Sequence, residues 1–162
     1  HNRFQKELIK PGDRVLAFPS SGPHTNGYSL INRLITEGKM NPDKWINDLT
    51  CPHRNYYSEL TRIWNAHPIV QIKGLCHITG GGLIDNPPRI LPDEVRIEWD
   101  TWKLPSVFEE IKRVSGLDMD QMYRTFNCGL GMLMVVPDNK NMIDQLYQMF
   151  PDLLSVGIVR DK

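Results

Sequence analysis

The sequence lacks an excess of either charge, any long apolar run and any regular cysteine pattern. Lysines plus arginines equal aspartates plus glutamates, at 19 each, so no broad field favours nucleic acid or an anionic membrane surface. No apolar stretch approaches the roughly 20 residues that a membrane-spanning helix needs. The first residues, His1 to Gln5, do not resemble a signal peptide. We therefore expect a cytoplasmic protein with no nucleic-acid or membrane partner.

Cysteine is scarce and scattered, which argues against a disulfide framework and for a reducing compartment. The three cysteines are Cys51, Cys76 and Cys128, and none belongs to a CxxC pair. Cys51-x-His53 and Cys76-His77 offer four potential metal ligands, but neither spacing matches the usual zinc patterns. We predict no metal site from these residues. Cys128 is expected to be a small packed side chain and not a nucleophile.

Helical and strand patterns alternate along the chain, and 162 residues fit a single domain spanning residues 1–162. Apolar spacing predicts strands at residues 14–18, 69–79, 95–99, 130–136 and 155–159. It predicts helices at residues 28–35, 55–66, 106–114, 118–123 and 138–150. Interspersed helices and strands favour a layered α and β architecture. The continuously apolar segment 130–136 is expected to be a central strand, covered on both faces.

Local signals predict how several elements begin and end. Ser106 and Glu109 have the spacing of a capping box, and Asp138 is expected to cap the last helix. Gly74 marks a possible bulge in its strand, and Pro68 is expected to stop the preceding helix. The segment 42–53 has no clear periodicity and is expected to be irregular.

Three segments combine polar groups with small residues. The first runs from Ser20 to Ser29, between a predicted strand and a helix, and contains Ser21, His24 and Asn26. Its small residues let a ligand approach the backbone, and the following helix offers unpaired amides. Such a loop can hold an anion. The alternative is an ordinary turn in which Asn26 caps the helix.

The second segment is Thr79-Gly80-Gly81-Gly82, again between a strand and a helix. Successive glycines allow their amides to converge on an oxyanion. The segment matches neither the Walker loop nor GxGxxG. A tight turn that needs positive φ is an equal alternative.

The third segment contains Arg124 and Asn127 beside an apolar strand. Arginine suits phosphate or carboxylate recognition. The alternative is a buried network that ties a helix to the sheet.

Taken together, the three segments resemble the C-terminal domain of the phosphoribosylformylglycinamidine cyclo-ligase (aminoimidazole ribonucleotide synthetase) family. The matching stretches are PSSGPHTNGYSLINRL at 19–34, HITGGGLIDNPPRILP at 77–92 and MYRTFNCGLGMLMVVP at 122–137. They occur in the family's order and the resemblance covers nearly the whole chain. The first two are shared in varied forms across a superfamily of ATP-dependent enzymes, whereas NPPRILP and MYRTFNCG point to the cyclo-ligase.

The resemblance implies an α+β fold with three α/β/α layers and a mixed, largely antiparallel sheet. It implies an ATP-dependent ligase of purine biosynthesis that converts formylglycinamidine ribonucleotide into aminoimidazole ribonucleotide, with release of ADP and phosphate. It places His24 in a catalytic role. The residues that it implies for substrate binding are Ser20, Ser21, Asn26, Thr79, Gly80, Gly81, Gly82, Arg124 and Asn127.

The resemblance also implies partners. Family enzymes have an N-terminal domain that carries most of the ATP and magnesium ligands and forms the dimer core, and nothing in this chain corresponds to it. We therefore expect ATP, magnesium, a phosphorylated ribonucleotide, an N-terminal domain and a homodimeric full enzyme. The isolated chain is expected to be inactive. A non-catalytic binding or assembly domain, or another ATP-dependent synthetase of the superfamily, remains an alternative.

Overall fold

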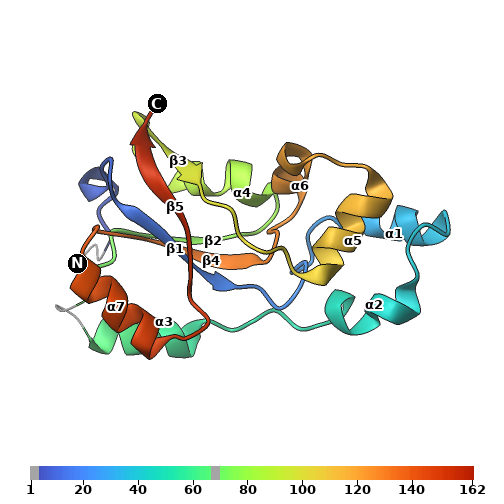
Figure 1. Cartoon of the computed structure of the whole chain (residues 1–162), viewed down its shortest axis with the longest axis horizontal. Helices are drawn as coiled ribbons and strands as arrows, with labels where there is room; N and C mark the ends of the chain where they lie inside the picture. The colour runs from blue at the N-terminus through green and yellow to red at the C-terminus, as the bar shows by residue number, and fades with distance from the viewer. Residues whose placement is uncertain (1–3, 67–69) are drawn as a thin grey trace.

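A computed structural model describes residues 4–66 and 70–162 of the chain. In this part seven α-helices and five strands form three layers, a central sheet with helices on both faces (Figure 1). No helix in the described part is both long enough and apolar enough to cross a bilayer.

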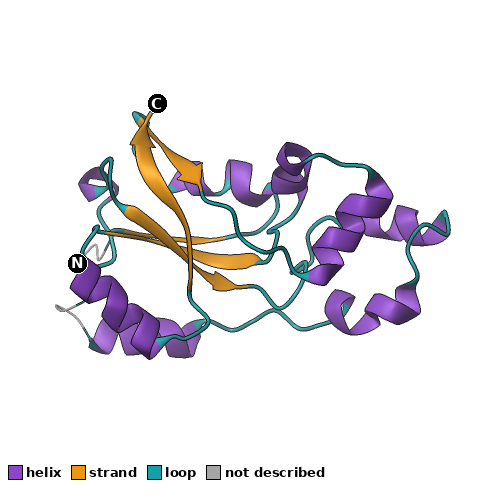
Figure 2. Ribbon diagram, viewed as in Figure 1, coloured by secondary structure: helices purple, strands orange, loops and turns teal. Residues whose placement is uncertain are grey.

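The sheet has the strand order β2-β4-β1-β5-β3, and its four pairings are all antiparallel (Figure 2). The strands are β1 (Arg14–Pro19), β2 (Gly74–His77), β3 (Val95–Trp99), β4 (Leu130–Val136) and β5 (Leu154–Asp161). The expected α+β class and largely antiparallel sheet are confirmed. β4 lies between β2 and β1, as its continuous apolarity predicts.

The α-helices are α1 (Tyr28–Thr36), α2 (Pro42–Leu49), α3 (Tyr57–Asn65), α4 (Gly82–Asp85), α5 (Ser106–Ser115), α6 (Met119–Thr125) and α7 (Lys140–Met149). Two 3₁₀ turns, η1 (Lys6–Leu8) and η2 (Pro87–Arg89), complete the described elements. α3 and α7 lie side by side under one face of the sheet (Figure 1). α1, α2 and α5 lie beyond the end of the sheet that is away from α7 (Figure 1).

Alternation along the central strands builds a core on each face of the sheet. In β1, Val15 and Ala17 pack with α1, α2, α5 and α6, whereas Leu16 and Phe18 pack with α3 and α7. All four side chains are at most 1% exposed. A strand buried on both faces needs apolar residues at every position, which explains the unbroken apolar run in β1 and β4.

The prediction that residues 42–53 are irregular is wrong, because residues 42–49 form α2. Pro42 occupies the first helical turn, where its missing N–H costs nothing, and the Asn41 side chain accepts the Asp43 amide at 3.0 Å. Trp45 and Leu49, four residues apart, bury the inner face. Asn-Pro-Asp followed by this spacing was a readable helix signal.

Several predicted boundaries also need correction. Pro105 and not a Ser106 capping box precedes α5, and Asn139 and not Asp138 caps α7, through the Met142 amide. Gly74 is in register with Val135, so no bulge occurs there. β2 is shorter than the predicted strand; Ile69 and the proposed stop at Pro68 lie outside the described residues.

The three cysteines have different surroundings. Cys51 is exposed, whereas Cys76 and Cys128 are buried and all three are free thiols. Burial raises the pKa of Cys76 to about 11 and that of Cys128 to about 12. Because the thiolate is the reactive form, the two buried thiols should be inert at neutral pH.

We therefore predict that one thiol per native chain, Cys51, reacts quickly with a disulfide reagent such as dithionitrobenzoate at pH 8. All three should react after unfolding in denaturant. Absorbance of the released thiolate gives the count, and Cys51→Ser should remove the fast phase alone. Fast labelling of two or three thiols in the native protein would contradict the buried positions.

Candidate active site

The loop after β1 turns sharply inward and carries His24. His24 and Thr25 have φ values of 52° and 65°, in the left-handed region that side chains rarely adopt. His24 is 3% exposed. Strained residues of this kind persist only where the surroundings fix them, and they concentrate at functional sites.

Asn127 holds this loop in place from inside the protein. It is fully buried, and its Oδ1 accepts the Ser20 hydroxyl at 3.0 Å and the Gly129 amide at 2.9 Å. Its Nδ2 donates to the Gly22 carbonyl at 2.8 Å. Asn127 thus uses both ends of its side chain inside the protein, which favours the structural network over direct ligand contact. Ser20 likewise spends its hydroxyl on Asn127.

The His24 ring is held by Ser21. Nε2 accepts the Ser21 amide at 3.0 Å and lies 2.9 Å from the Ser21 hydroxyl, while Nδ1 is buried without a hydrogen-bond partner in the described residues. The ring stacks on His53, with centroids 4.5 Å apart, and the His77 centroid is 6.4 Å away. Burial, then His53 and His77, lower the pKa of His24 to about 4. At neutral pH His24 is therefore an uncharged imidazole.

Arg54 borders this site, although the sequence analysis did not select it. Its guanidinium pairs with Glu59 at 2.7 Å and Asp152 at 2.6 Å and lies over the rings of Phe18 and Tyr56. No local pattern marks Arg54, because Asp152 is 98 residues away. The two carboxylates compensate the charge of the guanidinium and hold it in one position at the border of the site.

The glycine loop, Thr79 to Gly82, is organised by Asn86. Asn86 is a second buried asparagine, which the sequence analysis did not select. Its Nδ2 donates to the carbonyls of Thr79, Gly80 and Gly82, at 3.3, 3.2 and 2.7 Å. Its Oδ1 accepts the Thr79 hydroxyl at 3.0 Å. Asn86 thus turns the loop carbonyls toward the interior. An asparagine before two prolines, seven residues after Thr79, was the available signal.

Only part of the glycine loop remains open to a ligand. The Gly82 amide donates to the Thr79 carbonyl at 3.0 Å, and Gly82 is buried with a φ of 58°. A Cβ there would overlap the Tyr123 carbonyl oxygen of α6, so glycine allows close packing on that helix. The amides of Gly80 and Gly81 have no acceptor within the described residues. They are the candidate anion donors.

The loop that carries His24 and Asn26 lies next to the glycine loop, whereas Arg124 is at the surface. A Cβ on Gly80 would lie 3.8 Å from Asn26 Oδ1. Asn26 Nδ2 is buried without a partner in residues 4–66 and 70–162, and Gly27, not Asn26, precedes α1 as its cap. The capping alternative for Asn26 is thus wrong. Arg124, at the end of α6, is exposed and forms no ion pair with a described residue.

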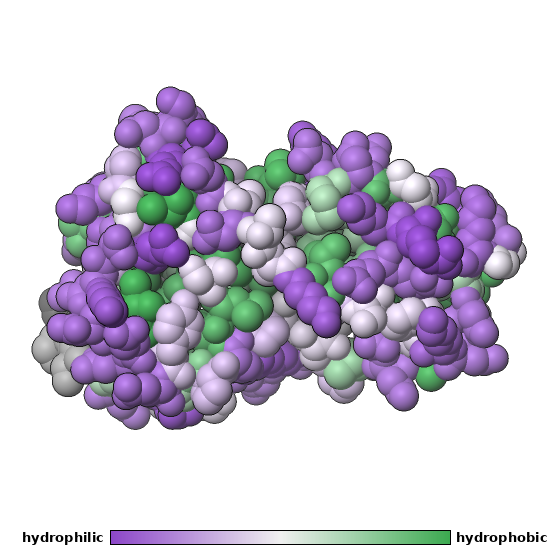
Figure 3. All heavy atoms as spheres, in the orientation of Figure 1, coloured by the Kyte–Doolittle hydropathy of each residue, from purple (hydrophilic) through white to green (hydrophobic). Residues whose placement is uncertain are grey.

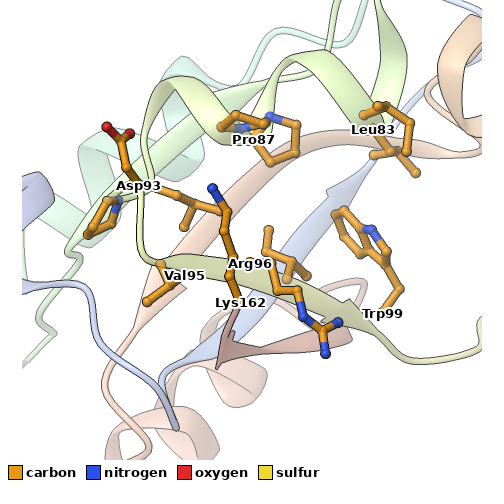
Figure 4. A pocket seen from close by; sticks show the side chains of 12 residues that line it. Leu83, Pro87, Asp93, Val95, Arg96, Trp99 and Lys162 are labelled. Carbon is orange, nitrogen blue, oxygen red and sulfur yellow. The ribbon is translucent and has the colours of Figure 1, made fainter.

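A separate shallow pocket lies between α4, η2 and β3. Leu83 and Pro87 line one side, and Val95 and Trp99 line the strand opposite (Figure 4). Its volume of about 200 Å³ is below the roughly 300 Å³ of an ordinary small-molecule site. Elsewhere, the face in Figure 3 is largely hydrophilic, with hydrophobic side chains showing across its middle. His24 Nδ1 and Asn26 Nδ2, which are buried without a hydrogen-bond partner among the described residues, both belong to the loop after β1. They favour that loop and the adjoining Thr79–Gly82 loop over this pocket as the candidate site.

Gly131 in β4 leaves the space in which the site is built. A Cβ at this position would overlap the Tyr56 hydroxyl and lie 3.1 Å from His24 Cε1. The Tyr56 hydroxyl donates to the Pro19 carbonyl at 2.9 Å, and Tyr56 is 5% exposed. Neither ring has room to retreat.

Gly131→Ala should therefore destabilise the fold by about 1–3 kcal/mol, the usual range for overpacking. Chemical denaturation with fixed slope measures the change. Tyr56→Phe removes the overlapping oxygen, so adding Gly131→Ala to Tyr56→Phe should cost clearly less than adding it to the parent chain. Equal costs in the two backgrounds would show that Tyr56 is not the obstacle.

Comparison with known proteins identifies the family. Residues 10–148 match the family model described as AIR synthase related protein, C-terminal domain. A phosphoribosylformylglycinamidine cyclo-ligase from Chromobacterium violaceum is 41% identical over 137 residues, which cover 79% of this chain and 39% of that protein. The cyclo-ligase of the same name from Pseudothermotoga lettingae is 37% identical over 161 residues, covering 92% of this chain and 46% of that protein.

The chain spans less than half the length of these curated relatives. Among solved structures, the fold is similar to that of tt0281 from Thermus thermophilus, with a TM-score of 0.58 and 14% identity, covering 95% of this chain and 48% of that one. At this identity the likeness concerns the fold alone. Through its match over residues 10–148, the chain belongs to the AIR synthase related protein family, as a C-terminal domain.

Proposed function

We propose that the chain is the C-terminal half of a phosphoribosylformylglycinamidine cyclo-ligase. The reaction would convert formylglycinamidine ribonucleotide and ATP into aminoimidazole ribonucleotide, ADP and phosphate. The observation that carries the proposal is the pairing of the His24 loop with the glycine loop, since both belong to segments that resemble the family. The names of the relatives at 37–41% identity support it.

The reaction requires that the formyl oxygen be converted into a good leaving group. The formyl amide oxygen attacks the γ-phosphorus of ATP, an O–P bond forms, and ADP leaves. The amidine nitrogen then attacks the formyl carbon, a C–N bond closes the ring, and phosphate departs with that oxygen after loss of nitrogen-bound protons. The protein has to position two anionic ligands and stabilise the charge that develops.

His24 suits the role of a neutral hydrogen-bond donor beside the formyl oxygen. Its Nε2 accepts the Ser21 amide, so the neutral ring carries its proton on Nδ1, which has no acceptor among the described residues. A lowered pKa keeps the ring uncharged at neutral pH. A neutral imidazole can polarise an oxygen or relay a proton without adding a fixed charge.

The remaining candidate residues divide into donors and supports. Gly80, Gly81 and Asn26 offer amides that have no acceptor among the described residues, and we propose that these amides bind a phosphate group. Arg124, in the last turn of α6, is available as a surface cation. The residues that would shape the site without reaching the ligand are Ser20, Ser21, Thr79, Gly82 and Asn127.

ATP and magnesium belong to the complete enzyme in this proposal. Among the described residues, the one group of candidate metal ligands is His24, His53 and His77, and Mg²⁺ prefers oxygen ligands. We therefore assign no Mg²⁺ ligand to this chain, and propose that an N-terminal half supplies most contacts to Mg-ATP. A homodimer in the cytoplasm is the proposed full assembly.

The decisive experiment joins this chain to the N-terminal half of the Pseudothermotoga lettingae relative and measures aminoimidazole ribonucleotide formation with Mg-ATP. We expect turnover by the chimera, at roughly 1–1000 per second, and none by this chain alone. His24→Ala should lower turnover or substrate affinity at least tenfold with the melting temperature retained.

Cys128→Ala is the matched control. It should change stability by about 1 kcal/mol and leave turnover nearly unchanged. A well-folded chimera without activity, or an active His24→Ala variant beside a dead Cys128→Ala variant, would refute the assignment. A folded but inactive chimera would favour a binding or assembly domain.

A second test concerns the phosphate subsite. Titration of the labelled chain with ribose 5-phosphate should shift the amide resonances of Gly80 and Gly81. The Gly38 amide, which donates to the Ile35 carbonyl at 3.0 Å, should not move and is the internal control. Asn86→Ala should abolish the shifts, because three carbonyls lose the side chain that turns them inward. Unmoved glycine-loop resonances at saturating ligand would contradict the subsite.

A further inference from the structure

Three histidines from distant parts of the chain meet at one point. His24 lies in the loop after β1, His53 precedes α3, and His77 ends β2. One ring nitrogen from each lies within 4.8 Å of the other two. We propose that His24, His53 and His77 form a binding site for a divalent transition metal such as Zn²⁺.

The ligand chemistry is that of a zinc-type site. Imidazole nitrogens suit Zn²⁺, Cu²⁺ and Ni²⁺, and three protein ligands leave a position for water or another ligand. Tetrahedral ligands at about 2.0 Å from zinc are about 3.3 Å apart. The three ring nitrogens, which lie within 4.8 Å of one another, therefore have to approach by up to about 1.5 Å. His53 and His77 are exposed, whereas His24 is buried. The His24 and His53 rings are stacked, so the exposed His53 ring has to turn out of the stack before both nitrogens can point at one ion.

The cysteines that might compete are arranged differently. Successive residues of β2 alternate between the two faces of the sheet, so Cys76 and His77 face opposite sides. Cys76 packs in the core that contains α1, α2, α5 and α6. Cys51 is exposed and is not within this group. Arg54, next to His53, does not add a free positive charge, because Glu59 and Asp152 both pair with it.

A buried nitrogen without a partner supports the site independently. His24 is 3% exposed and its Nδ1 has no hydrogen bond within the described residues. A metal on Nδ1 replaces the proton there, and the ring then carries its proton on Nε2. Metal binding and the proposed donation from Nδ1–H to a formyl oxygen therefore exclude each other. The Ser21 hydroxyl oxygen, 2.9 Å from Nε2, can accept a hydrogen bond from this Nε2–H, because the hydroxyl donates its own hydrogen to the Pro52 carbonyl at 2.7 Å. The amides of Ser21 and Arg54, which donate to Nε2 at 3.0 and 3.5 Å, lose their bonds to the ring in this exchange.

The test uses the chain without a polyhistidine tag, freed of metal by a chelator. Calorimetry with Zn²⁺ and visible absorption with Co²⁺ should each give one ion per chain. His53→Gln and His77→Gln should each weaken binding at least about tenfold, the lower end of what even supporting residues of metal sites cost. Cys51→Ser, in the same loop as His53, should bind as the parent chain does.

Three outcomes would overturn the site: no binding, equal affinity in both histidine variants and the parent chain, or loss of binding in Cys51→Ser. His1 and His67 remain in every variant, so binding through them would appear as unchanged affinity. Nitrogen NMR of the His24 ring should report a change from the Nδ1–H to the Nε2–H tautomer, and an unchanged tautomer would remove His24 from the ligand set. These readouts need neither substrate nor an N-terminal half, so their failure is separate from failure of the proposed function.

Discussion

The candidate site depends on one constraint, that polar backbone groups buried beneath a loop must be hydrogen bonded. Two asparagines satisfy it. Asn127 ties the His24 loop to the start of β4, and Asn86 gathers three carbonyls of the glycine loop. An unpaired buried polar group costs about 1–3 kcal/mol, so each asparagine stabilises one loop conformation over its alternatives. The amides of Gly80 and Gly81, in contrast, have no acceptor in the part of the chain that the structure describes.

The environment of His24 follows from the same loop. Its left-handed backbone places the ring under His53 and beside His77, where burial and the two neighbouring imidazoles disfavour a positive charge. Gly131 provides the space beneath the ring. A residue that looks like an exposed loop histidine in the sequence is therefore a buried, neutral imidazole. That state suits hydrogen-bond donation to an oxygen and, with a change of tautomer, coordination of a metal.

Much of the fold was predictable because the central strands bury both faces. The apolar run in β4, the alternation in β3 and the periodicity of α1 and α5 each determine an element by themselves. Boundaries were less predictable: the α2 helix was missed, and the caps of α5 and α7 were misassigned to Ser106 and Asp138. Cap choice depends on which backbone amides a side chain reaches, and neighbouring polar residues are nearly equivalent until the chain is folded.

The sequence by itself determined a layered α and β architecture and the main elements. Through three segments that resemble a family, it also indicated the α+β class and the loops that carry the candidate chemistry. Tertiary structure alone decided which polar groups remain open. The family resemblance implies that Ser20 and Asn127 contact a substrate, yet the two side chains bond to each other within the protein. His24, His53 and His77 belong to three segments with no common motif, and only sheet pairing and loop closure bring their nitrogens within 4.8 Å. Spacing along a chain encodes local contacts, whereas contacts across dozens of residues exist only after the core has packed.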